Sequence, residues 1–258
     1  MRTIRLTIAY DGTGYVGWQR QEPRTARSTR NETGESVQGL IEDALAKIEG
    51  GLVTLHGAGR TDAGVHALGQ VASARIGSAL DDGTLERALN ANLPPAIRIL
   101  GVRTAPDDFH ARFSATAKTY EYRIWNGPAV PPFVRLYTWH VPQPLDVASM
   151  MAASAAIAGE HDFAAFQGTG GAAQTTVRRV ISASWHAEGP AVTFTITGDG
   201  FLRHMVRSLV GTFVEIGHGR FPPDHVARLL AAPDRTQAGR TAPACGLFLV
   251  RVEYQPTL

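Results

Sequence analysis

A single aspartate, Asp62, lies in a glycine-rich stretch that reads GAGRTDAGVHALGQV (Gly57–Val71). Glycine adopts positive φ angles and lets another backbone or a ligand approach closely. The stretch lacks the GK[ST] ending of a phosphate-binding loop, and it contains no Ser–His pair, second catalytic carboxylate or set of metal ligands. If Asp62 is catalytic, it therefore acts alone as a nucleophile or base, and the adjacent guanidinium of Arg60 would favour its ionised form. A purely structural turn is the alternative.

Two further stretches bear on that choice. DGTGYVGWQRQ (Asp11–Gln21) follows a predicted strand and is rich in glycine and aromatic residues. GFLRHMVRSLVGT (Gly200–Thr212) places Arg203 and Arg207 four residues apart, so we expect both on one face of a helix. The two arginines could equally be solvated or could cap neighbouring acids.

The first 105 residues or so are predicted to run strand, helix, strand, strand, helix, strand. Apolar residues alternate over residues 3–10, which is typical of a half-buried strand. An apolar stripe over residues 37–48 predicts a helix that begins after Ser36 and ends at Gly50. The other elements expected here are strands over residues 52–56, 70–76 and 97–104 and a helix over residues 84–93.

A similar order follows. Strands are predicted over residues 118–125, 177–185, 192–197 and 246–254, and helices over residues 147–157, 202–216 and 224–231. We therefore predict an α+β protein with two RRM-like or ferredoxin-like halves, residues 1–105 and 106–258, each an antiparallel sheet backed by helices. The halves are expected to join around a central active-site cleft in which Asp62 meets Arg203.

The chain has 258 residues and a formal net charge of only +2, and every cation except Lys47 and Lys118 is an arginine. This bias is compatible with RNA binding, because guanidinium groups pair with phosphates and stack on bases. A GC-rich genome would produce the same bias. The segment from Gln21 to Ser36, with arginines at 24, 27 and 30, is predicted to be a surface loop, either a solvated insertion or a basic arm that contacts phosphates.

Cys245 is the only cysteine, so an internal disulfide or a cysteine-based zinc site is excluded. The nine histidines are scattered without metal-ligand spacing. The N-terminus MRTIRLTIAY lacks an apolar core of the kind found in signal peptides, and no stretch approaches 18 apolar residues. We therefore expect a cytoplasmic protein with no metal, no cofactor and no membrane span.

Five stretches taken together resemble the TruA family of tRNA pseudouridine synthases, which act on the anticodon arm. They are YDGTGYVGWQRQ, GAGRTDAGVHALGQVA, FHARFSATAKTYEYRI, GDGFLRHMVRSLVGT and TAPACGLFLVRVEY. They occur in the family's order and span almost the whole chain, and GRTDAGVHA is highly specific.

The resemblance implies a role for five residues. Asp62 matches the catalytic aspartate, and Tyr120 matches the tyrosine that packs against the target base. Arg203 matches the arginine that pairs with the catalytic carboxylate. Arg60 matches the arginine linked to holding the flipped-out nucleotide, and Leu247 matches an apolar residue of the pocket wall.

The resemblance also implies an isomerase that converts uridine to pseudouridine at positions 38, 39 and 40 of the tRNA anticodon stem and loop. Such an enzyme needs no cofactor, binds tRNA and forms a homodimer. The reaction breaks the N1–C1′ bond and rejoins the uracil through C5, so the base has to be extruded from the RNA at a cost of a few kcal/mol. Asp62 could attack C1′ or abstract a C2′ proton, and the sequence does not separate the two.

Two other classes of protein are alternatives. A non-catalytic RNA-binding module would share the paired α+β halves, but it would not need a carboxylate, and no RNP-like string is present. A glycoside or nucleoside hydrolase with an aspartate nucleophile would need a partner acid to protonate the leaving group, and none stands out.

Overall fold

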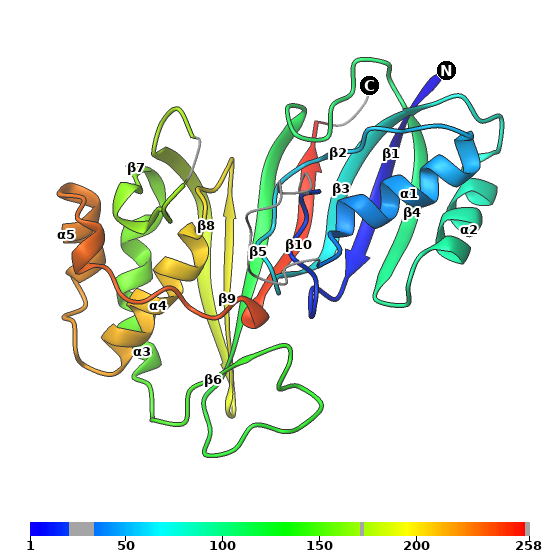
Figure 1. The fold of residues 1–258 in the computed structure, drawn as a ribbon. Helices are drawn as coiled ribbons and strands as arrows, with labels where there is room; N and C mark the ends of the chain where they lie inside the picture. Colours follow the sequence, from blue (N-terminus) through cyan, green and yellow to red (C-terminus); the bar gives the residue numbers. More distant parts are fainter. Residues whose placement is uncertain (21–33, 171–172, 256–258) are drawn as a thin grey trace, which may run out of the picture. The chain divides into compact units, whose positions relative to one another are not determined.

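The computed structural model describes residues 1–20, 34–170 and 173–255 (Figure 1). The chain forms two compact units, which we call unit 1 (Met1–Thr116 and Leu249–Leu258) and unit 2 (Ala117–Phe248). The division predicted from the sequence lies between residues 105 and 106, about ten residues before the boundary at Thr116, and it does not place the last residues of the chain with the first unit. The predicted loop with arginines at 24, 27 and 30 lies outside the described residues.

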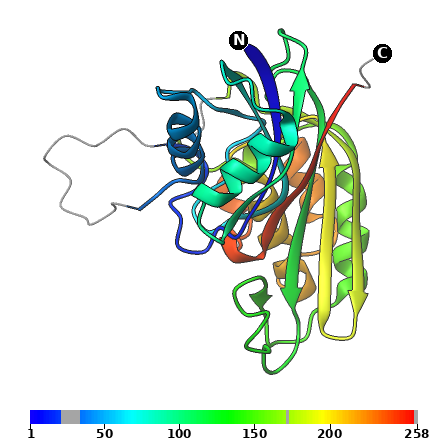
Figure 2. The same cartoon turned by 90° about the vertical axis from the view of Figure 1, so that its right-hand side faces the viewer.

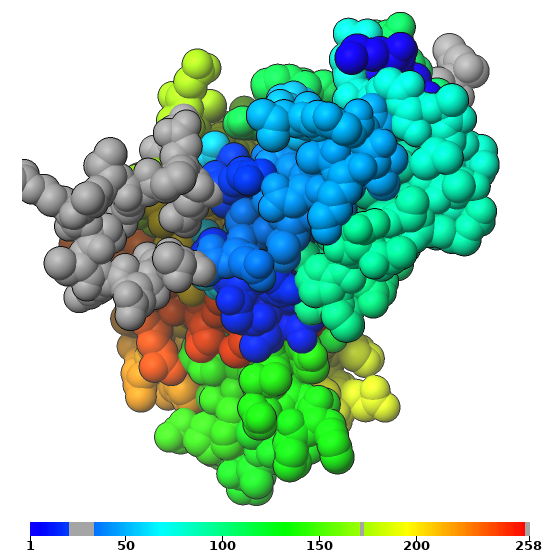
Figure 3. Space-filling view, turned by 45° about the vertical axis from the view of Figure 1, so that its right-hand side comes forward, coloured from blue at the N-terminus to red at the C-terminus, as the bar shows by residue number. Residues whose placement is uncertain are grey.

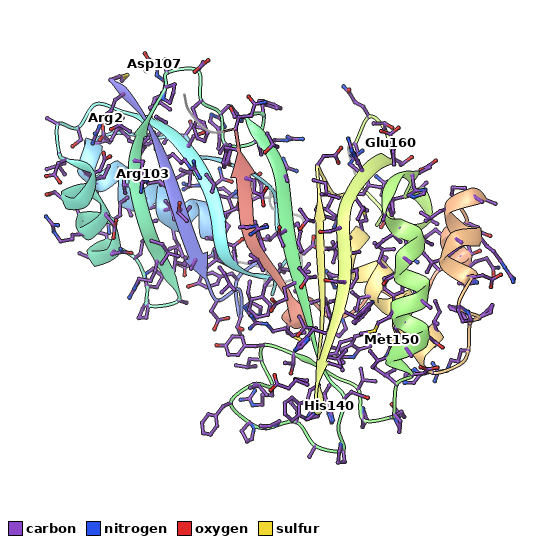
Figure 4. All side chains as sticks on the ribbon, turned by 180° about the vertical axis from the view of Figure 1, so that it is seen from behind. Arg2, Arg103, Asp107, His140, Met150 and Glu160 are labelled. Carbon is purple, nitrogen blue, oxygen red and sulfur yellow. The ribbon has the colours of Figure 1, made fainter. Side chains whose placement is uncertain are left out.

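Unit 1 is built on a sheet whose central strand is β1 (Arg2–Tyr10). Strands β3 (His66–Ile76) and β4 (Ile97–Ala105) pair with it antiparallel on either side, and the short β2 (His56–Gly57) pairs with β3. Helices α1 (Val37–Glu49) and α2 (Asp82–Asn92) cover one face (Figures 1 and 4) and pack side by side (Figure 3). The strand order β4-β1-β3-β2 is that of a ferredoxin-like unit.

The last strand of the chain, β10 (Leu247–Tyr254), lies beside β3, and most of it belongs to unit 1. Gly69 of β3 has no room for a side chain, because a Cβ there would lie 2.4 Å from the carbonyl oxygen of Val250. The hydroxyl of Tyr254 donates to the carbonyl oxygen of Ala111 at 2.8 Å, and the guanidinium of Arg5 lies 4.5 Å from the Tyr254 ring centroid. Contacts with residues far earlier in the chain therefore tie this strand into unit 1.

Helix α1 begins and ends where the sequence predicts. The Ser36 hydroxyl accepts a hydrogen bond from the Gly39 amide at 3.1 Å, which caps the first turn. Ile41 and Leu45 are fully buried on the sheet side. Gly50 ends the helix with a left-handed φ of 71°, a conformation that costs glycine little.

In unit 2 the strands lie in the order β5 (Ala115–Trp125), β9 (Ala191–Gly198), β8 (Val177–Glu188) and β7 (Gly159–Asp162). These neighbours pair antiparallel, whereas the short β6 (Trp139–His140) pairs parallel with β5. Helices α3 (Val147–Ser154) and α4 (Met205–Gly217) lie on one face of the sheet (Figure 2), and α5 (His225–Ala231) follows. Single 3₁₀ turns span Ala155–Ile157, Ala164–Phe166, Arg235–Gln237 and Ala244–Gly246.

The core of unit 2 fixes α4 against the sheet. The ring of Phe213 lies 5.4 Å from that of Phe194 and 5.7 Å from that of Trp185. Gly217 allows a close approach to Met150 of α3 (labelled in Figure 4), because a Cβ there would lie 2.7 Å from the Met150 sulfur. The α+β class and the helix-backed antiparallel strands predicted from the sequence are thus confirmed.

Two local predictions are wrong. The strand expected over residues 52–56 is absent from residues 52–55 and is reduced to the two-residue β2. Helix α4 begins at Met205 rather than at residue 202, because His204 adopts a left-handed φ of 62°. Arg203 therefore precedes the helix, and it does not share a helical face with Arg207.

Candidate active site

Asp62 occupies the first position of a tight turn that leads into β3. The Val65 amide donates to the Asp62 carbonyl oxygen at 3.1 Å, and Gly64 in the third position has a φ of 77°. A positive φ at this position is characteristic of a type II turn and favours glycine. The Asp62 residue is half-buried, and the neighbouring Arg60 is exposed. Gly64, the last residue of GRTDAG, is thus required by the turn that presents Asp62.

The Asp11–Arg20 segment packs its backbone against this turn. A Cβ at Gly12 would lie 2.1 Å from the Val65 carbonyl oxygen, and one at Gly17 would lie 2.6 Å from the Thr61 carbonyl oxygen. Gly17 has a φ of 106°, and the amide of the next residue, Trp18, donates to the same Thr61 oxygen at 3.0 Å. Both glycines are therefore needed for the two motifs to touch.

The same segment is joined to the start of α1. The amides of Val37 and Gln38 donate to the carbonyl oxygens of Gly17 and Trp18 at 3.1 and 2.9 Å. The Asp11–Arg20 segment is thus held between the Asp62 turn and a capped helix, and this arrangement gives the turn a rigid support.

A buried histidine completes the backbone contacts. His66 is 1% exposed, and its Nδ1 accepts a hydrogen bond from the Gly12 amide at 3.0 Å. The same nitrogen lies 3.1 Å from an Asp11 carboxylate oxygen. Nδ1 of His66 is therefore in contact with both the Gly12 amide and the Asp11 carboxylate, and the start of β3 is tied to both residues.

Polar side chains also fix the residue before Asp62. Thr61 is buried, and its Oγ1 lies 2.8 Å from the Tyr10 hydroxyl. Gln70 donates through Nε2 to the Gly59 carbonyl oxygen at 2.8 Å. Sequence reasoning missed Tyr10, Thr61 and Gln70. The available signal was that Tyr10 is the one polar side chain on the buried face of the predicted first strand.

In unit 2, Tyr120 and Leu247 lie in well-packed positions. Tyr120 on β5 is 7% exposed and meets Phe201 edge-on, with ring centroids 5.0 Å apart. Leu247 is the first residue of β10 and is 6% exposed. The segment just before it is held by the hydroxyl of Tyr122, which donates to the Pro243 carbonyl oxygen at 2.8 Å, and by Arg207 Nε, which donates to the Ala242 carbonyl oxygen at 2.7 Å.

Arg203 is exposed and fastened to a neighbouring loop. Its Nη1 donates to the Thr169 carbonyl oxygen at 2.8 Å, and its own carbonyl oxygen accepts from the Gly168 amide at 2.8 Å. Gly168 also faces the His204 ring, where a Cβ would lie 2.4 Å from Nδ1. Arg207, in contrast, is half-buried in the first turn of α4.

The predicted residues thus fall into two sets. Unit 1 carries Arg60 and Asp62, and unit 2 carries Tyr120, Arg203 and Leu247. Among residues 1–20, 34–170 and 173–255, no group of three or more His, Cys, Asp or Glu side chains is arranged to hold a metal ion. Over the same ranges no helix has the length and apolar character needed to span a bilayer.

Comparison with known proteins assigns the family. A family model described as tRNA pseudouridine synthase matches residues 6–114 and 153–255. A protein of Pelobacter propionicus named tRNA pseudouridine synthase A is 45% identical over 98% of this chain and 100% of its own length. Proteins of the same name from Syntrophotalea carbinolica and Geotalea uraniireducens are also 45% identical, covering 99% and 98% of this chain and 98% and 100% of their own lengths. The chain belongs to the tRNA pseudouridine synthase family.

Proposed function

We propose that the protein isomerises uridine to pseudouridine at positions 38, 39 and 40 of the tRNA anticodon stem and loop. Family membership supports the reaction and the tRNA substrate. The observation that carries the proposal in this chain is the Asp62 turn, in which three glycines from two motifs place a half-buried carboxylate at the entry to a strand.

Asp62 is the proposed catalytic group. In the first route Asp62 attacks C1′ and displaces uracil N1, the uracil turns, and C5 then displaces the Asp62 oxygen from C1′. In the second route removal of the C2′ proton expels uracil and leaves a C1′–C2′ double bond, and the proton returns to C2′ when C5 bonds to C1′. The proton on C5 is then lost and N1 gains one, so atoms balance without a redox partner. A fixed carboxylate is suited to this work because an oriented group avoids much of the entropy loss of reaching the transition state.

The other predicted residues act on the nucleotide. Tyr120 offers an aromatic ring against which the extruded uracil packs, and Leu247 forms part of the apolar wall of the uracil pocket. Arg60, which is exposed two residues before Asp62, holds the flipped-out nucleotide or its backbone. These assignments rest on the match to the family's motifs.

A cation paired with the Asp62 carboxylate is the further part of the proposal. The resemblance assigns this role to Arg203, whose guanidinium donates to the Thr169 carbonyl oxygen. Arg207 is the alternative, because its half-buried position in α4 suits a charge that has to act on a shielded carboxylate. Comparing Arg203→Ala with Arg207→Ala decides between them. Loss of the arginine that pairs with Asp62 is expected to lower turnover far more than it lowers tRNA affinity.

The decisive test measures tritium release from tRNA transcripts that carry uridine labelled at C5. Asp62→Asn is expected to abolish release and to keep tRNA affinity within a few-fold, because it removes the charge and preserves the size of the side chain. Asp108→Asn, which changes an exposed carboxylate of unit 1, is the matched control and is expected to release tritium at the wild-type rate. Turnover by Asp62→Asn would leave Asp62 as a turn residue only.

The proposal extends to assembly and location. A cytoplasmic homodimer, which would double the basic surface available to one tRNA, is supported by the resemblance to the family. Light scattering coupled to gel filtration tests it, and a single-chain mass at micromolar concentration would contradict it.

A further inference from the structure

Three buried polar side chains of unit 1 meet at the Asp62 turn and are not used by the chemistry proposed above. Tyr10 is 4% exposed, Thr61 is 8% exposed and Gln70 is 0% exposed. They come from the end of β1, from the residue before Asp62 and from the middle of β3. Because buried polar groups need partners, their contacts with one another are the first thing to account for.

The contacts hold the chain on both sides of Arg60. The Tyr10 hydroxyl and Thr61 Oγ1 share a hydrogen bond at 2.8 Å. Gln70 donates to the Gly59 carbonyl oxygen at 2.8 Å. The chain is therefore fixed at Gly59 and at Thr61, directly before the catalytic position.

Both the side chain and the main chain of Thr61 are held. Its Oγ1 is fixed by Tyr10, and its carbonyl oxygen accepts the Trp18 amide at 3.0 Å. Asp62 follows without an intervening residue, so a change in the orientation of Thr61 is transmitted directly to the backbone that carries the carboxylate.

The Tyr10 hydroxyl is unsuited to proton transfer. Burial raises the pKa of Tyr10 to about 12, and the hydrogen bond with Thr61 only partly offsets this rise. The hydroxyl therefore stays protonated at neutral pH, and what it contributes near Asp62 is a fixed hydrogen bond.

We propose that Tyr10 is a positioning residue: its hydroxyl holds Thr61 while Gln70 holds Gly59, and together they set the place from which the Asp62 carboxylate reaches the ribose. The inference rests on the catalytic role proposed for Asp62. It predicts that loss of the hydroxyl slows the chemical step, because a misplacement of about 1 Å can cost roughly 100-fold in rate.

The first test is Tyr10→Phe, which removes one oxygen and keeps the ring. We expect the single-turnover rate of tritium release at saturating tRNA to fall about 10- to 100-fold, while the tRNA dissociation constant stays within about two-fold. The matched control is Tyr254→Phe, which removes a hydroxyl that donates to the Ala111 carbonyl oxygen in the same unit but has no bond to Thr61. The control is expected to release tritium at the wild-type rate.

The second test removes the other half of the hydrogen bond. Thr61→Val deletes the hydroxyl at nearly constant volume, and Thr61→Ser keeps it, so the serine variant is expected to be the faster of the two. If Tyr10 acts through Thr61, the double variant Tyr10→Phe/Thr61→Val is no slower than the slower single variant, because residues that share one contact are not additive. Multiplied rate losses in the double variant would contradict the coupling.

The outcomes separate this inference from the proposed function. If Asp62→Asn is inactive but Tyr10→Phe matches Tyr254→Phe in rate, the positioning role is refuted and the catalytic role stands. If Asp62→Asn retains turnover, the catalytic role itself fails. Should Tyr10→Phe not fold, the comparison of Thr61→Val with Thr61→Ser decides, and equal rates for these two refute the inference.

Discussion

Replacement of Gly17 by alanine tests whether backbone packing at the Asp62 turn controls catalysis. Gly17 has a φ of 106°, which L-residues rarely adopt, and the added Cβ would lie 2.6 Å from the Thr61 carbonyl oxygen. It would also lie 3.1 Å from the Ala63 amide nitrogen and from the Asp62 carbonyl carbon. The new methyl group therefore presses on the turn itself rather than on a flexible side chain.

The magnitude follows from these distances. A strained backbone conformation of this kind costs about 1–3 kcal/mol, which corresponds to a loss of several degrees in Tm for a chain of this size. A carbon and a carbonyl oxygen in contact normally lie about 3.3–3.6 Å apart, so the Asp62 turn has to move by roughly 0.7–1 Å. Because Asp62 is the proposed catalytic group, a shift of that size is expected to lower the single-turnover rate about 100-fold.

The control lies three residues away. Gly14 also has a positive φ, 82°, but a Cβ there would meet nothing within 4 Å. Gly14→Ala is therefore expected to show a comparable loss of Tm, measured by scanning calorimetry, with a rate of tritium release close to wild type. If Gly17→Ala and Gly14→Ala release tritium at the same rate, the packing of Gly17 against the turn has no bearing on catalysis.

Three further predictions concern the base, the RNA and pH. Tyr120→Phe is expected to keep stacking and to lose any step that needs the hydroxyl, whereas Tyr120→Ala also loses stacking worth about 1–3 kcal/mol; equal single-turnover rates for the two variants would show that the ring face does not matter. Arg178 and Arg179 of β8, changed together to alanine, are expected to flatten the plot of log binding constant against log salt concentration by about 0.7–0.9 for each phosphate that is no longer neutralised. Single-turnover chemistry at saturating tRNA should stay intact. An unchanged slope in filter binding would place the RNA elsewhere. The pKa of Tyr10 is raised from 10.0 to about 12, so the unfolded chain gives up the phenol proton first. The contribution of Tyr10 to stability is therefore full below pH 10 and is lost as the pH rises through 12. Over this interval the urea midpoint should fall less steeply in Tyr10→Phe than in the wild type, and an identical fall would contradict the assignment.

Elements set by local signals are those that the sequence predicts well. Helix α1 has its cap at Ser36, its apolar face and its stop at Gly50 within one short segment, and each signal acts on residues three or four positions away. The start of α4 is not local in this sense. The left-handed His204 packs against Gly168, and no pattern within residues 200–212 shows that contact.

The candidate site divides in the same way. The GRTDAG stretch is recognisable as a tight turn, because Gly64 supplies the positive φ that the turn needs. What supports the turn is distant in sequence: the hydrogen bond between Tyr10 and Thr61 joins residues 51 positions apart, and Gly12 and Gly17 reach the turn from another motif. Such pairings depend on the register of β1 against β3, which a single sequence does not display.

The place of β10 in unit 1 has a consequence for biosynthesis. The ribosome makes residues 1–116 first, then all of unit 2, and only afterwards the strand that lies beside β3. At about 5–20 residues per second, the β3 edge that receives β10 waits on the order of ten seconds for its neighbour. An exposed strand edge is a template for unwanted pairing during such an interval. The unit that carries Asp62 is therefore the one that depends on late-synthesised residues, so a nascent chain interrupted within unit 2 leaves the Asp62 carboxylate on an unfinished sheet.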